Sequence, residues 1–95
     1  MEYSITIDDV FAAAGRLDGI VKRTPVVSAE EIDKVAGRQV LMKCENLQHI
    51  GAFKFRGATN AVIMLGDDAE SGVCTHSSGN HAQACLLYTS DAADE

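Results

Sequence analysis

A lysine flanked by two aromatic residues is the feature of this sequence that most suggests chemistry. Lys54 lies between Phe53 and Phe55, directly after Gly51-Ala52, at the start of an apolar stretch that predicts a helix. An amine partly removed from water near a helix N-terminus is pushed toward its neutral form. A neutral lysine amine can attack carbonyl compounds to form a Schiff base. The same residues also fit an ordinary helix start whose lysine lies along the surface, and this octapeptide alone leaves both interpretations open.

A second stretch predicts a binding site for an anion. Residues 72–76 read as a short buried strand, and a helix is expected to begin near Asn80. A small polar turn between a strand and a helix presents free backbone N–H groups and side-chain donors to one point. The residues of this turn are Ser77, Ser78, Gly79, Asn80 and His81.

Residues 51–58 (GAFKFRGA) and 75–84 (THSSGNHAQA) together resemble the two N-terminal signatures of the threonine/serine dehydratase and serine racemase family. The resemblance extends from about Ile5 to Ala84, and the presence of both motifs in order makes it specific. It implies an α/β fold, an incomplete piece of the parallel-sheet, tryptophan-synthase-β-like fold (fold type II), and pyridoxal 5'-phosphate as cofactor.

The same resemblance implies a role for each residue of the two motifs. Lys54 would form the Schiff base with the cofactor, Phe53 would pack on one face of the pyridine ring, and Asn80 would hydrogen-bond its phenolic oxygen. The turn from Ser77 to His81 would hold the α-carboxylate of the substrate. Ser78 would exchange a proton on the ring face opposite Lys54, although a hydroxyl in such a turn is otherwise usually a cap or a backbone ligand.

The reaction implied is abstraction of the α-proton by Lys54, followed by loss of the β-hydroxyl as water and hydrolysis of the aminoacrylate to a keto acid and ammonia. Reprotonation by Ser78 would instead make the protein a serine or hydroxyaspartate racemase. Nucleotide-regulated racemases of the family carry a basic residue and hydroxyls where this sequence has His49, Ala29 and Glu30. We therefore expect a threonine/serine dehydratase, with racemase as the alternative, acting on a small amino acid and assembled as a homo-oligomer.

Length and composition restrict the domain count, the cellular location and the partners that this sequence allows. A chain of 95 residues holds one small domain at most, and it corresponds to the opening quarter or so of a family enzyme. The first residues lack the basic region and apolar core expected of a signal peptide, and three cysteines without a close pair suggest a reducing, cytoplasmic location. The net charge of −6 and the absence of a long apolar run argue against nucleic acid and membrane as partners.

The last eleven residues, 85–95, depart from the family and match the translation of a sequencing adaptor. The predicted domain organisation is therefore an N-terminal part of a pyridoxal-phosphate-dependent enzyme domain over 1–84 and a non-native tail over 85–95. Without the three acids of this tail, 11 acidic and 8 basic residues remain, a net charge of −3. The charge argument against nucleic acid therefore weakens.

The pattern of the chain predicts how these residues are positioned. Capping boxes at Thr6–Asp9 and Ser28–Glu31 indicate two helix starts, and Gly37 indicates a helix end. Residues 39–44 read as a strand, and Phe55, Ala58, Val62 and Leu65 mark the buried face of the next helix. Strand, helix, strand and helix in alternation predict parallel pairing.

Other site types fit less well. Cys74, His76 and His81 do not have the spacing of a metal site, so no metal is expected. The glycines form neither a dinucleotide fingerprint nor a P-loop. The family's glycine-rich phosphate loop and its partner for the pyridine nitrogen do not occur in this sequence. The chain as given is therefore expected to be an inactive truncated fragment of the enzyme.

Overall fold

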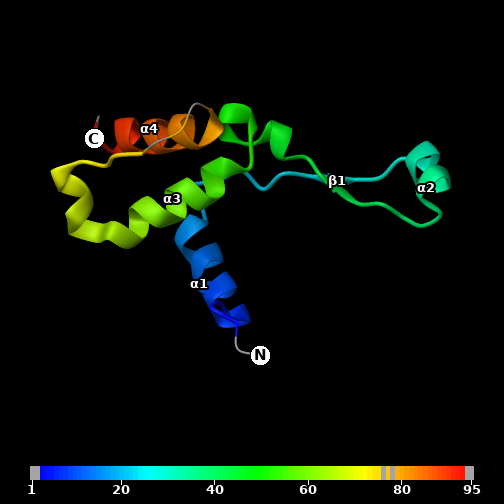
Figure 1. Cartoon of the computed structure of the whole chain (residues 1–95), viewed down its shortest axis with the longest axis horizontal. Helices are drawn as coiled ribbons and strands as arrows, with labels where there is room; N and C mark the ends of the chain where they lie inside the picture. The colour runs from blue at the N-terminus through cyan, green and yellow to red at the C-terminus, as the bar shows by residue number, and fades with distance from the viewer. Residues whose placement is uncertain (1–2, 76, 78, 94–95) are drawn as a thin grey trace.

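The computed structural model describes residues 3–75, 77 and 79–93, which form a body of helices with a projecting arm (Figure 1). Its extents are 51 × 34 × 26 Å and its radius of gyration is 16.3 Å, against about 12 Å for a compact domain of this length. The elements, with η for 3₁₀ helices, are α1 (Ile7–Leu17), β1 (Val26–Val27), α2 (Glu30–Ala36), β2 (Met42–Lys43), η1 (Glu45–Leu47), η2 (His49–Gly51), α3 (Lys54–Leu65), η3 (Gly66–Ser71) and α4 (Asn80–Ala93).

Helix α1 begins at the capping box that the sequence predicts. The backbone N–H of Thr6 donates to Asp9 Oδ2 at 2.7 Å, and the N–H of Asp9 donates to Thr6 Oγ1 at 3.3 Å. These two bonds satisfy N–H groups that would otherwise have no partner at the start of the helix.

Helix α2 confirms its predicted end but not its predicted start. Gly37 has the left-handed φ of 74° that favours glycine, and its N–H donates to Asp33 O at 2.9 Å. The N-cap is Ala29, which has no side-chain cap bond, so the capping box predicted at Ser28 is wrong. Ser28 lies one residue before the N-cap, outside the position from which a hydroxyl reaches the first turn.

The predicted parallel pairing of strands is wrong within the described residues. There β1 and β2 form a two-stranded antiparallel sheet, with Val26 opposite Lys43 and Val27 opposite Met42. The short helix α2 reverses the chain between them, which suits an antiparallel pair. Residues 72–75 have no regular secondary structure, because a strand requires a ladder neighbour and the described residues supply none there. Residue 76, the end of that predicted strand, lies outside the described residues.

The core lies between α3 and α4. Phe55 and Ala58 of α3 pack with Ala84 and Cys85 of α4, and Ile50 packs against this cluster. Burial confirms the predicted inner face of α3 at Phe55, Ala58 and Val62, whereas Leu65 in its last turn is 45% exposed. Figure 1 shows α3, in green, and α4, in orange to red, running in the same direction, away from the arm.

Helix α4 continues without interruption from Asn80 to Ala93, across the boundary predicted between residues 84 and 85. Cys85 is buried in the core described above. The assignment of 85–95 as a non-native tail stays a prediction. Among the described residues, no helix combines the length and apolar character needed to cross a membrane.

Candidate active site

Lys54 is the first residue of α3, as the sequence predicts. Its two aromatic neighbours differ in burial: Phe55 lies in the core and is 4% exposed, whereas Phe53 is 63% exposed. The Lys54 Nζ lies 5.7 Å from the centroid of the Phe53 ring. The lysine side chain is itself exposed, which corrects the expectation that it is partly removed from water. With Phe53 turned outward, only one of the two predicted aromatic neighbours is buried.

The polar turn precedes α4, and its described residues face solvent. Ser77 Oγ accepts a hydrogen bond from the N–H of Gly79 at 3.2 Å, which closes a small turn. Ser77, Gly79 and Asn80 are exposed, and Asn80 is the first residue of α4. The N–H groups at the start of this helix therefore face an accessible surface. Ser78, predicted as a catalytic residue, lies outside the described residues.

His81 differs from the other described residues of the turn. It lies in the first turn of α4 and is partly buried, with Nε2 at 3.8 Å from Cys85 Sγ. Its imidazole is thus directed along the helix toward the core. His81 is among the residues predicted to hold a carboxylate, and its backbone N–H is better placed for this than its ring.

The packing of α3 on α4 brings the two motifs to the same side of the helical body. Phe55 and Ala58 of α3 contact Ala84 and Cys85 of α4, and both helices begin on the side from which the arm projects (Figure 1). Lys54 precedes Phe55 directly, and Asn80 lies one turn before Ala84 on α4. An amine and a set of open N–H groups therefore belong to neighbouring helix starts.

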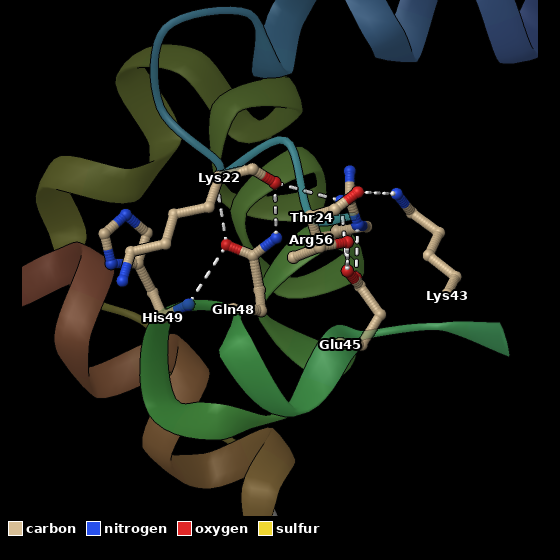
Figure 2. A network of polar contacts seen from close by, with 7 residues as sticks. All are labelled: Lys22, Thr24, Lys43, Glu45, Gln48, His49 and Arg56. Atoms are coloured by element: carbon tan, nitrogen blue, oxygen red, sulfur yellow. Dashed lines mark hydrogen bonds and ion pairs between the residues drawn. The ribbon is translucent and has the colours of Figure 1, made fainter. Parts of the chain in front are cut away.

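A polar cluster around Arg56, in the first turn of α3, is the part of the site that was not predicted from the sequence. The Glu45 carboxylate accepts hydrogen bonds from the Arg56 guanidinium through Nε and, at 3.2 Å, through Nη2 (Figure 2). Thr24 Oγ1 donates to Glu45 Oε2 at 2.5 Å, and Lys43 Nζ donates to Thr24 O at 3.2 Å. Arg56 within the lysine motif, and an acid directly after a predicted strand, were the available signals.

The charges in this cluster alter the titration of Glu45. The hydrogen bond from Arg56, aided by that from Thr24, lowers the pKa of Glu45 to about 2 against the opposing effect of burial. The side chains of Glu45 and Arg56 are only 16% and 30% exposed. Glu45 is therefore a carboxylate that remains ionised and bound to Arg56 under ordinary conditions.

Gln48 fixes the loop between this cluster and Lys54. Its buried amide accepts from Lys22 N at 2.9 Å and donates to Lys22 O at 2.8 Å, as a neighbouring strand would. The same Oε1 accepts from the N–H of His49 at 3.0 Å. The His49 ring contacts Phe55 edge-on, with centroids 5.0 Å apart. The loop that leads to Lys54 is thus held to an earlier segment of the chain.

The described residues include no group of three or more His, Cys, Asp or Glu side chains arranged to hold a metal ion. The groups near Lys54 and Asn80 are an amine, an aromatic ring, an amide and backbone N–H groups. These suit an organic cofactor with an aldehyde, a planar ring and anionic substituents.

Comparison with known proteins agrees with this geometry. The family model "Pyridoxal-phosphate dependent enzyme" matches residues 17–92. β-Hydroxyaspartate dehydratase of Paracoccus denitrificans is 49% identical over 87 residues, covering 90% of this chain and 27% of the relative. Serine racemase of Oryza sativa subsp. indica is 48% identical over 86 residues, covering 90% of this chain and 25% of the relative. The structure of maize serine racemase matches with a TM-score of 0.81 and 48% identity over 90% of this chain and 27% of that one.

This chain belongs to the family of pyridoxal-phosphate-dependent enzymes. Its fold is part of the fold type II of the racemases that it matches, which confirms the fold predicted from the two motifs. The chain spans about a quarter of the length of the curated relatives named above.

Proposed function

We propose that the full-length protein carrying this sequence is an ammonia-lyase: it eliminates the β-hydroxyl of a β-hydroxy amino acid as water, and hydrolysis of the resulting enamine takes that water up again and yields a keto acid and ammonia. The observation that carries the proposal is that α3 begins at Lys54 and α4 at Asn80, on the same side of the helical body (Figure 1). An amine beside an N–H-rich turn suits a substrate with an α-hydrogen and a carboxylate. The similarity to a β-hydroxyaspartate dehydratase supports this choice and adds 3-hydroxyaspartate to serine and threonine as candidate substrates.

Pyridoxal phosphate, when bound, withdraws electrons from the substrate Cα and makes the α-hydrogen acidic. Lys54 Nζ would hold the cofactor through its aldehyde, and after the substrate amine has displaced it, the free amine would take the α-proton as general base. Its exposed position at the start of α3 leaves the amine accessible for both tasks. The exposed ring of Phe53 offers an apolar face for a planar ring, and the Asn80 amide would donate to the ring oxygen of the cofactor.

The turn before α4 binds the α-carboxylate in this proposal. Ser77 and Gly79 already close a turn through their 3.2 Å bond, so the backbone is arranged before the ligand arrives. The N–H groups at the start of α4 then donate to the carboxylate, favoured by the positive end of the helix dipole. Fixing this group also directs the α-hydrogen toward Lys54.

Racemisation is the second candidate, because the chain is equally similar to serine racemases. It requires a group that reprotonates Cα from the face opposite Lys54, and Ser78 is the candidate. We further propose a cytoplasmic homo-oligomer, as the sequence analysis expects. The 95-residue chain alone is expected to lack activity, because the phosphate-binding loop of the family does not occur in its sequence.

A product analysis tests the proposal. The purified full-length protein, loaded with pyridoxal phosphate, is incubated with each enantiomer of serine, threonine and threo-3-hydroxyaspartate. A lyase forms keto acid and ammonia in equal amounts, which a coupled reduction of the keto acid measures. A racemase forms the opposite enantiomer, visible by chiral chromatography, in excess over keto acid. Absence of both products would refute the proposed function.

A further inference from the structure

The first turn of α3 is held on one side by two earlier segments of the chain. The Arg56 side chain bonds both oxygens of Glu45 and donates from Nη2 to Lys22 O at 3.1 Å (Figure 2). Thr24 binds the same carboxylate at 2.5 Å. We call Thr24, Glu45 and Arg56 the carboxylate clamp. A bidentate Arg–carboxylate pair fixes direction as well as distance, so the clamp restricts how α3 begins.

Lys54 and Arg56 lie two residues apart in α3 and therefore point to nearly opposite sides of the helix. Phe55, between them, is buried in the core. With Phe55 packed and Arg56 bound, the rotation of the first turn about its axis is fixed. The direction in which Lys54 leaves the helix is then fixed as well, although no bond is made to its amine.

The backbone just before Lys54 needs such support. Ile50 has a φ of 62°, a conformation that β-branched residues rarely adopt, and Gly51 follows with a φ of 73°. Such strain persists only where surrounding contacts impose it. Gly51 N–H donates to Gln48 O at 2.8 Å, and the Ile50 side chain packs against the core. The clamp holds the segments on both sides of this turn, at Glu45 and at Arg56.

We infer that Glu45, acting through Arg56 with the support of Thr24, is a positioning residue for the Lys54 amine. This inference rests on the proposed function of Lys54. It assigns to a carboxylate bound by Arg56, on the side of α3 opposite Lys54, a role in presenting that lysine to the cofactor and the substrate. Loss of the clamp leaves Lys54 in place in the sequence but lets the first turn of α3 move.

The test measures the reactivity of Lys54 itself in the full-length protein freed of cofactor. Added pyridoxal phosphate is the probe: Nζ adds to the aldehyde carbon, water leaves, and borohydride delivers hydride to the C=N carbon to give a stable secondary amine. Mass spectrometry then gives a labelling rate for each lysine. The variants are Glu45→Gln and the pair Thr24→Val and Thr24→Ser, and the matched control is Glu30→Gln in the exposed Glu30–Lys34 pair.

Glu45→Gln should slow the labelling of Lys54 by about tenfold or more, since small displacements of a reacting group have large effects on rate. Labelling of Lys34 should not change. Thr24→Val should lower the labelling rate of Lys54 by about threefold. Thr24→Ser, which keeps the hydroxyl, should have a rate within about twofold of the wild type. In the loaded protein, kcat should fall with labelling while KM changes by less than about twofold. Glu30→Gln should leave the labelling rate of Lys54, kcat and KM at the values of the wild type.

Each remaining outcome is decisive. If Lys54 of the wild-type protein is not labelled, the proposed function fails. If it is labelled, and Glu45→Gln and Thr24→Val only lower the melting temperature while labelling per folded molecule stays the same, the clamp is merely structural and the inference is wrong. Should Glu45→Gln not fold, the Thr24→Val and Thr24→Ser pair decides by the same criterion.

Discussion

At Glu45, one carboxylate joins three parts of the chain through hydrogen bonds to Arg56 and Thr24. Because the pKa of Glu45 is lowered from 4.5 to about 2, the folded protein binds its proton less readily than the unfolded chain. The resulting stabilisation is present above pH 4.5 and is lost as the pH falls from 4.5 toward 2. Acid should therefore loosen the segment that leads to Lys54.

Replacing Glu45 by Gln should destabilise the full-length protein at neutral pH by about 1.5–3 kcal/mol, because a hydrogen bond to a charged group is lost. The difference in the free energy of unfolding between this variant and the wild type should decrease as the pH falls from 4.5 to 2. Urea unfolding at several pH values measures it. Glu30→Gln, in a pair whose side chains are 74% and 80% exposed, should change stability by less than about 1 kcal/mol. A difference for Glu45→Gln that does not depend on pH would contradict this assignment.

Thr59 has a buried hydroxyl that finds no hydrogen-bond partner among the described residues. Thr59→Val keeps the shape and removes the unsatisfied group, so it should stabilise the full-length protein by about 1 kcal/mol. Thr59→Ser, the control, keeps the hydroxyl and loses a methyl group, and should destabilise it. Denaturant unfolding compares the two variants. A loss of stability in Thr59→Val would mean that the hydroxyl has a partner in the full-length protein.

At the scale of elements, the features predicted from the sequence are those set by neighbouring residues. Thr6 and Asp9 define the start of α1, and Gly37 ends α2, because capping depends on residues a few positions apart. Lys54 begins a helix for a similar local reason. These local signals also position both motifs correctly at helix starts.

The features that the sequence did not predict depend on distant residues. The bond between Glu45 and Arg56 spans 11 residues and that between Thr24 and Glu45 spans 21, and neither spacing follows a helical or strand period. The antiparallel β1–β2 pair likewise depends on how α2 returns the chain. The exposure of Lys54 is a third such case, since burial depends on which distant segments pack nearby.

Helix α2 offers a test at this scale, because its N-cap residue makes no side-chain cap bond. Ala29→Asp should supply an acceptor for the first-turn N–H groups and stabilise α2 by about 0.5–1 kcal/mol. Amide hydrogen exchange in residues 30–36 should slow by about two- to fivefold if this helix opens locally. Ser28→Asp, one residue earlier, is the control and should change little. An equal effect of the two substitutions would show that α2 begins earlier than described.

The whole molecule is extended and carries apolar side chains on its surface. The arm exposes Val35 at 91% and Leu41 at 65%, and α1 exposes Ile7 at 65% and Phe11 at 68%. Surfaces of this kind are usually covered by other parts of a folded protein. This agrees with a chain that spans about a quarter of its relatives.

The isolated 95-residue chain should therefore be aggregated or molten rather than natively folded. We expect no sharp transition by calorimetry and a self-associated species by light scattering, because the small core between α3 and α4 leaves much apolar surface in water. A soluble monomer with a sharp melt would contradict this expectation.

The most direct test of the account is the fate of Lys54 in the full-length protein. Borohydride reduction of the cofactor-loaded protein should attach the label to Lys54, and Lys54→Ala should abolish both the visible absorbance of the bound cofactor and the label. Turnover should fall by at least ~10²–10⁴-fold, the usual contribution of a positioned general base. Lys34→Ala, at an exposed site on α2, should retain all three properties. If Lys54→Ala kept the absorbance and normal turnover, with the label on another lysine, the assignment of this site would be wrong.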